Sequence, residues 1–445
     1  MSGDFKKAQT GDFLSGPILP PLISFAIPLL LSLLLQALYG GVDLAVVGQF
    51  SPPASSSAVA TGSQVMQTLT GLITGLTMGV TVLVGKAMGA QDREGAGQVV
   101  AGQIRLFFLV AAVLTGGMIL LAPQIATALN VPEAARGETI RYIRICSGGI
   151  VFITAYNGIS GIFRGIGNSR SPFLFVLVAC CINIVLDLLF VGVFRMHASG
   201  AALATILAQA ASVGFSLNYM RRHPLPFPVK ANLRRSGGSV GRILKVGSPI
   251  ALQDFLTNIT GIINTLGVAA SAGVGIAEKL FVFLAIVPMS FMSALSTFVA
   301  QNMGAGKPER ANKALFQAMG ISFCFGAVMF LLTFFAGGWL ANLFSRDPQV
   351  IEAAREYLRG SSFEYLMVSV TFCFLGYFNG REHTTFVMAQ GLLAAFLIRI
   401  PLSYFFSRLP QTGMFLISLA VPASALVNQL LCVGYFLLLT RRRKA

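Results

Sequence analysis

The chain has 445 residues, of which 55% are hydrophobic and only 11% are charged. A soluble protein carries about a quarter charged residues, so this composition excludes a soluble globular domain and predicts an all-α polytopic membrane protein. The formal net charge is +16, but the basic residues lie at the ends of the apolar runs. That distribution is typical of membrane topology and argues against nucleic acid as a partner.

Twelve apolar runs are long enough to cross a bilayer core, which requires about 20 helical residues. Most lysines and arginines fall in the loops on the side of the N-terminus, so the positive-inside rule predicts that both termini are cytoplasmic. We expect a multi-pass protein of the plasma (inner) membrane, with the lipid bilayer as a partner. The predicted spans are residues 20–50, 57–84, 96–122, 137–164, 171–194, 199–220, 241–270, 276–302, 312–337, 352–379, 384–408 and 412–440.

The two halves of the chain repeat each other. Met88-Gly-Ala90 recurs as Met303-Gly-Ala305, and Gly161-Ile-Phe-Arg-Gly165 recurs as Gly376-Tyr-Phe-Asn-Gly380 at the same offset. Six spans per repeat give both halves the same orientation, related by a pseudo-two-fold axis along the membrane normal, which is typical of a transporter. The predicted parts are an N-terminal lobe (1–220), a basic cytoplasmic linker (221–240) and a C-terminal lobe (241–445).

Asp43 lies deep in the first predicted span, where an unpaired Asp costs about 2.5–3.5 kcal/mol. It must therefore be protonated, bind an ion or face a wet cavity. Asn183 and Asp187, four residues apart, share one face of the fifth span, and Thr205 adds a hydroxyl from the sixth. These oxygens suit Na⁺, or a proton shared by two carboxylates. The alternative is that Asp43 and Asp187 only hydrogen-bond helices together.

Candidate substrate contacts lie in the second, seventh and eighth spans. Asp254 follows Pro249 in the seventh span, and it either faces the central cavity and attracts a cationic substrate or pairs with Gln253 or Asn258. Adaptable thioether side chains could line a pocket for apolar cations, or they could pack in the core or against lipid. The candidate methionines are Met66, Met289 and Met292.

In this order and spacing, these features resemble the multidrug and toxic compound extrusion (MATE) family. The resemblance rests on the two-lobe repeat, the Met-Gly-Ala turn in each half and a short set of motifs. These motifs are Pro28 followed by Gly-Gly-Val-Asp43, the Gly161–Gly165 turn, Asn183 with Asp187, and Arg399-Ile-Pro401. The resemblance implies a secondary active antiporter that exports amphipathic or cationic small molecules in exchange for H⁺ or Na⁺ by alternating access. We expect no other cofactor and a functional monomer.

The resemblance also implies roles for individual residues. Asp43, Asn183, Asp187 and Thr205 match the N-lobe cation site of the family, and Pro28 matches the point at which the first helix bends. A branch of the family has an acidic cation site in the C-lobe, with an Asp in the tenth span. Here that span has Glu364 near its start and no Asp, so the sequence leaves open whether Asp254 and Glu364 form a second site.

Three other functions have weaker support in the sequence. A lipid-linked oligosaccharide flippase of the same superfamily would need extra spans and a cationic cavity, whereas Arg399, deep in the eleventh span, is better explained as a structural residue paired with an acid or carbonyls. A major-facilitator transporter is suggested by Gly89-Ala-Gln-Asp-Arg-Glu-Gly95, but the repeat Gly304–Arg310 lacks that pattern. An enzyme is not expected, because the chain has no H-E-x-x-H motif and its three histidines lie in loops or at span ends.

Overall fold

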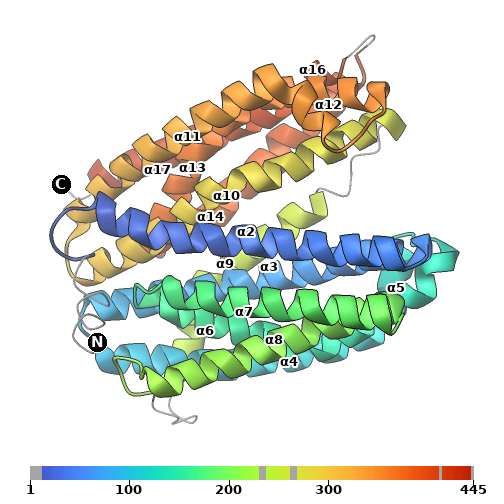
Figure 1. Ribbon diagram of the computed structural model, residues 1–445. Coiled ribbons are helices and arrows are strands. Elements are labelled where there is room, and N and C mark those ends of the chain that lie inside the picture. The colour runs from blue at the N-terminus through green and yellow to red at the C-terminus, as the bar shows by residue number, and fades with distance from the viewer. Residues whose placement is uncertain (1–12, 230–236, 261–267, 410–412, 442–445) are drawn as a thin grey trace. The chain divides into compact units, whose positions relative to one another are not determined.

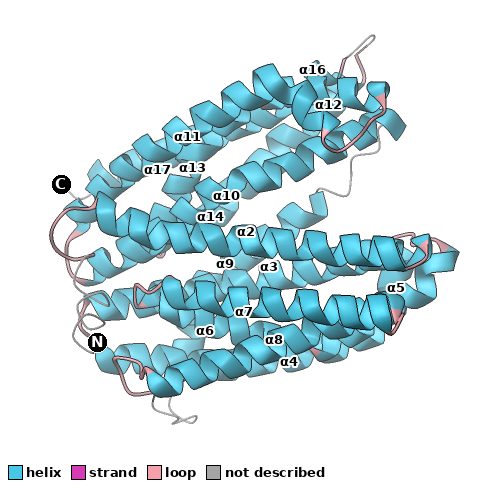
Figure 2. Ribbon diagram, in the orientation of Figure 1, coloured by secondary structure: helices cyan, strands magenta, loops and turns pink. Residues whose placement is uncertain are grey.

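The computed structural model describes residues 13–229, 237–260, 268–409 and 413–441; the side chains of 237, 254–260 and 268–272 lie outside the description. Within these ranges every regular element is a helix (Figures 1 and 2). The first half contains α2 (Leu19–Phe50), α3 (Pro53–Gly89), α4 (Arg93–Ala128), α5 (Glu133–Gly148), α6 (Ile150–Gly165), α7 (Arg170–Asp187), the π-helix η1 (Leu188–Val193) and α8 (His197–Arg222). The second half contains α9 (Gly237–Thr260), α10 (Val268–Gly304), α11 (Pro308–Asn342), α12 (Pro348–Ser361), α13 (Phe363–Gly380), α14 (Thr384–Leu393), the π-helix η2 (Ala394–Arg399), α15 (Ile400–Ser407), α16 (Met414–Ser418) and α17 (Ala420–Arg441).

The described residues contain nine helices, or up to eleven when each of two bent pairs counts as one, that are long and apolar enough to cross a membrane. These eleven coincide with eleven of the predicted spans. The remaining predicted span, 241–270, is helical from Gly237 to Thr260, and its last residues lie outside the description. The predicted all-helical, polytopic fold is confirmed.

The two bent pairs occupy matching positions of the internal repeat. α5 and α6 meet at 49° and α12 and α13 at 50°. In the first pair the break falls at Gly148-Gly149, where a helix has little to stabilise it. In the second pair, Ser361 and Ser362 donate their hydroxyls to the carbonyls of Leu358 and Arg359 at 3.4 and 2.7 Å, competition that bends helices.

The repeated glycine motif lets two helices approach closely in each half. On α6, a side chain at Gly161 would collide with Thr77 of α3, and one at Gly165 would lie 2.9 Å from the Thr81 carbonyl. The Thr81 hydroxyl also donates to the Gly161 carbonyl at 3.1 Å. On α13, Gly376 and Gly380 make the equivalent contacts with α10. Small residues at helix crossings are the usual means of close packing in membranes.

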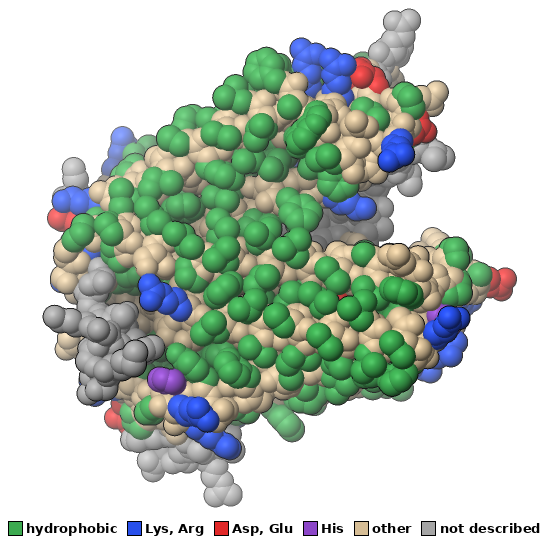
Figure 3. All heavy atoms as spheres, in the orientation of Figure 1, with side chains coloured by type: hydrophobic (Ala, Val, Ile, Leu, Met, Phe, Trp, Pro, Cys, Tyr) green, Lys and Arg blue, Asp and Glu red, His purple; other side chains and the backbone are tan. Residues whose placement is uncertain are grey.

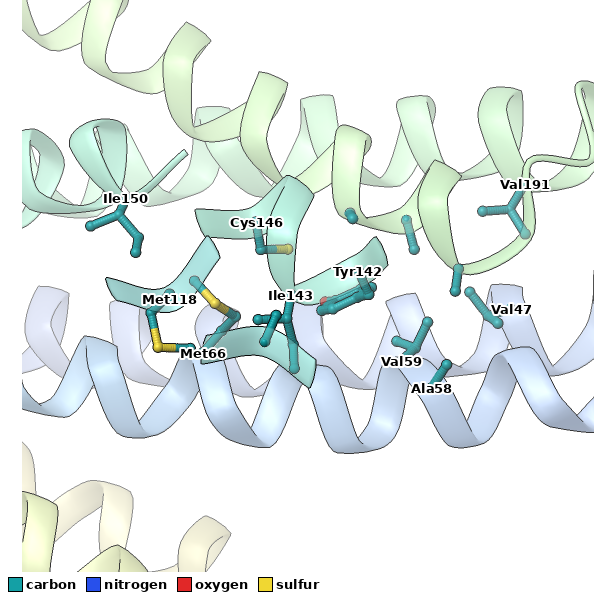
Figure 4. Packing of buried hydrophobic residues seen from close by; sticks show 14 of the residues in the cluster. Val47, Ala58, Val59, Met66, Met118, Tyr142, Ile143, Cys146, Ile150 and Val191 are labelled. Atoms are coloured by element: carbon teal, nitrogen blue, oxygen red, sulfur yellow. The ribbon is translucent and has the colours of Figure 1, made fainter. Parts of the chain in front are cut away.

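Contacts divide the chain into two compact units. Unit 1 comprises Met1–Leu14 and Ile27–Phe255, and unit 2 comprises Ser15–Ala26 and Leu256–Ala445. The apolar core of unit 1 includes Val59 and Met66 of α3, Met118 of α4 and Ile143 of α5. Figure 4 shows the two methionines next to Ile143. Unit 2 has its own core around Leu280, Leu358 and Val421.

The exposed surface is mostly apolar. Large side chains such as Phe108, Leu120 and Phe335 are more than 70% exposed along the helices. Figure 3 shows hydrophobic side chains along the flanks of the helices, while most lysines and arginines in view lie toward the helix ends. Bilayer lipid, rather than water, is the solvent that such flanks require.

Candidate functional site

Three helices of unit 1 bring the predicted cation-site residues together. Asp43 lies on α2, Asn183 and Asp187 lie on the last turn of α7, and Thr205 lies on α8, which packs directly against α7. Asp187 is the last residue of α7 before the π-helix η1. A π-turn widens the helix and is frequent at functional sites. Here it directly follows the carboxylate.

The side chains of Asp187, Asn183 and Thr205 interact with the carboxyl group of Asp43. Thr205 Oγ1 donates a hydrogen bond to Asp43 Oδ2 at 3.5 Å and to the Ala201 carbonyl at 2.9 Å. Asp43 is 5% exposed, and Asn183 and Asp187 are fully buried. The four residues predicted from the sequence therefore form one buried polar cluster.

Several oxygens of this cluster are buried without a hydrogen-bond donor among the residues that the structure describes. They are Asp43 Oδ1, Asp187 Oδ1, Asp187 Oδ2 and Asn183 Oδ1. Buried oxygens of this kind normally have a partner, and each one without a donor costs about 1–3 kcal/mol. They are hard ligands, which suit Na⁺, and the carboxylates can instead take up protons.

The acid pair has no basic partner in the described part of the chain. Asp43 and Asp187 interact with each other, with Asn183 and Thr205, and with nearby tyrosine and cysteine side chains, and none of these groups is a lysine or arginine. Two carboxylates this close cannot both stay ionised in an apolar environment without compensation. The cluster therefore requires a cation or protons from outside the protein.

Two tyrosines that were not predicted from the sequence lie next to the cluster. Tyr39, one helical turn before Asp43, has a buried hydroxyl that interacts with Thr205 and Asp43. Tyr142 on α5 is 2% exposed, interacts with Asp43 and Cys146, and fits against Gly62 of α3. Tyr39 could have been predicted, because it lies four residues before Asp43 and so shares its helix face. Tyr142 could not, because it recurs in the second half as Tyr357, where the acid pair has no counterpart.

Pro28 lies inside α2. A proline at this position provides no N–H for the carbonyl four residues earlier, which weakens and bends a helix. Ser32 Oγ donates to the Pro28 carbonyl at 2.7 Å. The division between the units falls between Ala26 and Ile27. By its contacts, α2 thus belongs to unit 2 up to Ala26 and to unit 1 from Ile27 onward.

The predicted substrate residues are divided between the two units. Met66 is 8% exposed and packs in the core of unit 1 (Figure 4). In unit 2, Met289 is 40% exposed on α10, and the backbone of Met292 meets Gly376 of α13. The side chain of Asp254 lies outside the described residues. The role of these residues in a substrate cavity stays a prediction.

Arg399 has the acidic partners that its position inside a span requires. It ends the π-helix η2 and interacts with Glu364, Tyr357 and Glu278. Glu364 in turn interacts with Arg399. Glu364 and Glu278 thus have a positive charge from the protein itself, in contrast to the acid pair of unit 1.

The fold and the cluster define a polytopic helical membrane protein with an acid pair buried among its spans. A family model, MatE, matches residues 28–189 and 249–405, and the chain belongs to the MatE family of transporters. The resemblance predicted from the motifs is confirmed.

Similar proteins cover nearly the whole chain. The probable multidrug resistance protein YpnP of Bacillus subtilis is 27% identical over 414 residues, 91% of this chain and 92% of YpnP. The multidrug export protein MepA of Staphylococcus aureus is 24% identical over 409 residues, 87% of this chain and 88% of MepA. A solved structure described as the outward-facing conformation of a multidrug resistance MATE family transporter is 21% identical, covers 97% of this chain and 100% of its own, and has a TM-score of 0.89.

Proposed function

We propose that this protein is a secondary active antiporter that exports amphipathic, cationic organic molecules in exchange for H⁺ or Na⁺. The observation that carries the proposal is the buried acid pair of Asp43 and Asp187, which has no basic partner among the described residues. A pair that must be neutralised from outside is suited to binding and releasing a coupling cation in each cycle.

The proposed cycle uses two mutually exclusive occupancies. The coupling cation binds Asp43, Asn183, Asp187 and Thr205, and neutralises the acid pair. The organic substrate binds when the pair is charged and leaves when the cation arrives. Exclusion of one ligand by the other is a positive, unfavourable coupling free energy between two sites, and it is sufficient for antiport. Alternating access then exchanges the two ligands across the plasma (inner) membrane, with both termini cytoplasmic and the monomer as the functional unit.

Pro28 is the proposed hinge of this cycle. It lies two residues beyond the point at which α2 passes from the contacts of unit 2 to those of unit 1. The Ser32 hydroxyl donates a hydrogen bond to the Pro28 carbonyl, at the point where the helix backbone is weakened. A change of charge at Asp43, fifteen residues further along the same helix, would bias the bend there.

The experiment is ethidium efflux from proteoliposomes under an imposed Na⁺ gradient and, separately, under an imposed pH gradient. We expect Asp43→Asn to abolish gradient-driven efflux, because an amide cannot cycle between charged and neutral states. The variant should insert into the membrane normally.

Asp347→Asn is the matched control. Asp347 caps α12 by accepting a hydrogen bond from the backbone N–H of Gln349 at 2.9 Å, and Asn caps helices about as well. Full efflux by Asp43→Asn, or an equal loss in Asp347→Asn, would contradict the proposed site. The gradient that drives the wild type identifies the coupling ion.

The alternatives from the sequence have less support. Membership of the MatE family displaces the major-facilitator interpretation. A flippase for lipid-linked oligosaccharides would need positive charge to hold pyrophosphate, whereas Arg399 lies among Glu364 and Glu278.

A further inference from the structure

Arg310, near the start of α11, contacts the segment that leads into α2. Its guanidinium donates to the backbone carbonyls of Ser15, Gly16 and Pro17, at 2.9, 2.7 and 3.4 Å. These are charge-assisted hydrogen bonds, which are about twice as strong as neutral ones. One side chain therefore holds three consecutive peptide groups directly before the helix that carries Asp43.

We propose that Arg310 is a positioning residue, which anchors the N-terminal end of α2 to unit 2 so that bending at Pro28 moves the section of α2 bearing Asp43. The inference rests on the proposed hinge and cation site. It adds a residue that contacts neither ligand to the moving parts of the transporter.

The backbone before α2 is shaped to fit one guanidinium. Gly16 has a φ of +68°, in the left-handed region that residues with a Cβ rarely adopt, and no atom lies within 4 Å of the position a Cβ would take. The turn at Gly16 brings the carbonyls on either side of it within reach of the same side chain. A fork of several N–H donors, as in Arg, suits such a group of acceptors better than a single ammonium.

The hydrogen bonds of Arg310 hold this segment against the start of α11. Residues of 16–20 and 306–317 together line a pocket of about 880 Å³, and Arg310 is one of its lining residues. On the other side, the guanidinium lies over the ring of Phe298 of α10, 5.5 Å from its centroid. Phe298 is fully buried, so it gives the guanidinium a fixed support.

The anchored section of α2 ends next to the hinge. Ile18, directly before α2, and Leu22 and Phe25 of α2 are buried, and contacts change from unit 2 to unit 1 after Ala26. Beyond Pro28, most residues before Asp43 are at least partly exposed. A helix held at one end and loosely packed beyond a proline will bend at the proline.

In the other half of the repeat, the segment that precedes α9 contacts its neighbouring helix in a different way. At the start of α4, Gly97 leaves room for the backbone carbonyl of Pro228, which precedes α9. The residue equivalent to Arg310 there is Gly95. Both helix-leading segments lie on the start of a neighbouring helix, but among the described contacts only the segment before α2, which carries the acid, is held by an arginine.

The test is hydrogen–deuterium exchange of the full-length protein in lipid nanodiscs, read on the amides of residues 18, 19 and 22–26. We expect Arg310→Ala to speed their exchange by at least about tenfold, because it removes three charge-assisted hydrogen bonds. Arg310→Lys, which keeps the charge but loses the fork, should be intermediate. Ethidium efflux by Arg310→Ala should fall by at least about tenfold at an unchanged amount of inserted protein.

Lys313→Ala is the matched control, because Lys313 lines the same pocket and carries the same charge without a hydrogen bond to residues 15–17 among the described contacts. It should leave both exchange and efflux near wild type. Unchanged exchange in Arg310→Ala, or equal changes in Lys313→Ala, would overturn the anchor. Faster exchange with wild-type efflux would overturn its role in transport. Exchange also reports on the anchor if the wild type proves not to be ion-coupled, so the two proposals fail separately.

Discussion

Thr205 contributes a single hydroxyl group to the cation site, and one substitution can remove it. Its hydroxyl is the one donor that reaches the Asp43 carboxylate within hydrogen-bond distance among the described residues, at 3.5 Å. It also donates to the Ala201 carbonyl of its own helix. The same oxygen has a free lone pair, with which it can ligate a cation beside Asp43.

Thr205→Val keeps the β-branched shape and removes this oxygen. We expect the concentration of coupling cation at half-maximal efflux to rise about three- to tenfold, which corresponds to the about 0.5–1.5 kcal/mol of a typical hydrogen bond. Maximal efflux should change little. Thr333→Val in α11 is the control, since the Thr333 hydroxyl donates only to backbone carbonyls of its own helix. An unchanged half-maximal concentration in Thr205→Val would remove Thr205 from the site.

At this scale, the sequence identifies charged residues well and aromatic ones poorly. A carboxylate in an apolar span is costly wherever it lies, so Asp43 and Asp187 stood out without any structure. Tyr39 and Tyr142 did not, because a tyrosine in a membrane span is ordinary and only its neighbours give it a role. The partner of Arg399 was predicted as an acid or carbonyls, and the choice of Glu364 and Glu278 depends on where α13 and α10 place these acids.

At the scale of elements, the repeated glycine motif is a packing device. Gly380 of α13 faces the Ser296 carbonyl of α10, and a Cβ at Gly380 would lie 2.6 Å from that oxygen. In the first half, Gly165 and Thr81 repeat this contact at 2.9 Å. The motif that marked the family in the sequence therefore sets the distance between two spans in each half.

Gly380→Ala should destabilise the protein by about 1–3 kcal/mol, the usual cost of overpacking, and this should appear as a lower thermal midpoint in detergent. Gly320→Ala is the matched control on α11. A Cβ at Gly320 has no atom within 4 Å, and alanine favours the helix over glycine, so the midpoint should stay or rise. Equal midpoints for the two variants would show that the α10–α13 contact can relax.

The breaks inside the fourth and tenth spans show where hydropathy loses information. Residues 137–164 and 352–379 are each long enough for one straight span, and their hydropathy offers no reason to divide them. The structure bends both, by 49° and 50°, at a glycine pair and at a serine pair. Local backbone chemistry decides such breaks, and a window of mean hydropathy averages it away.

At the scale of the whole molecule, connectivity and contact divide the chain differently. The repeat places the lobe boundary in the basic linker, and the lobes at 1–220 and 241–445 remain a prediction. Contacts instead place the divisions inside α2 and α9, close to Pro28 and Pro249. A sequence repeat reports common ancestry of segments, whereas the packing of a helix can change along its length at a proline.

The acid pair also predicts how the whole molecule responds to the coupling ion. Any ligand that binds only the folded state stabilises it, by about 2.7 kcal/mol at a concentration 100 times its Kd. If Na⁺ is the coupling ion, NaCl should raise the thermal midpoint of the wild type relative to choline chloride at equal ionic strength. Asp187→Asn should lose this dependence, because it removes a charged ligand, whereas Asp347→Asn should keep it. Sodium-dependent stabilisation that survives in Asp187→Asn would place the ion elsewhere. A wild-type midpoint that ignores Na⁺, together with efflux driven by a pH gradient alone, would assign the coupling to protons shared by Asp43 and Asp187.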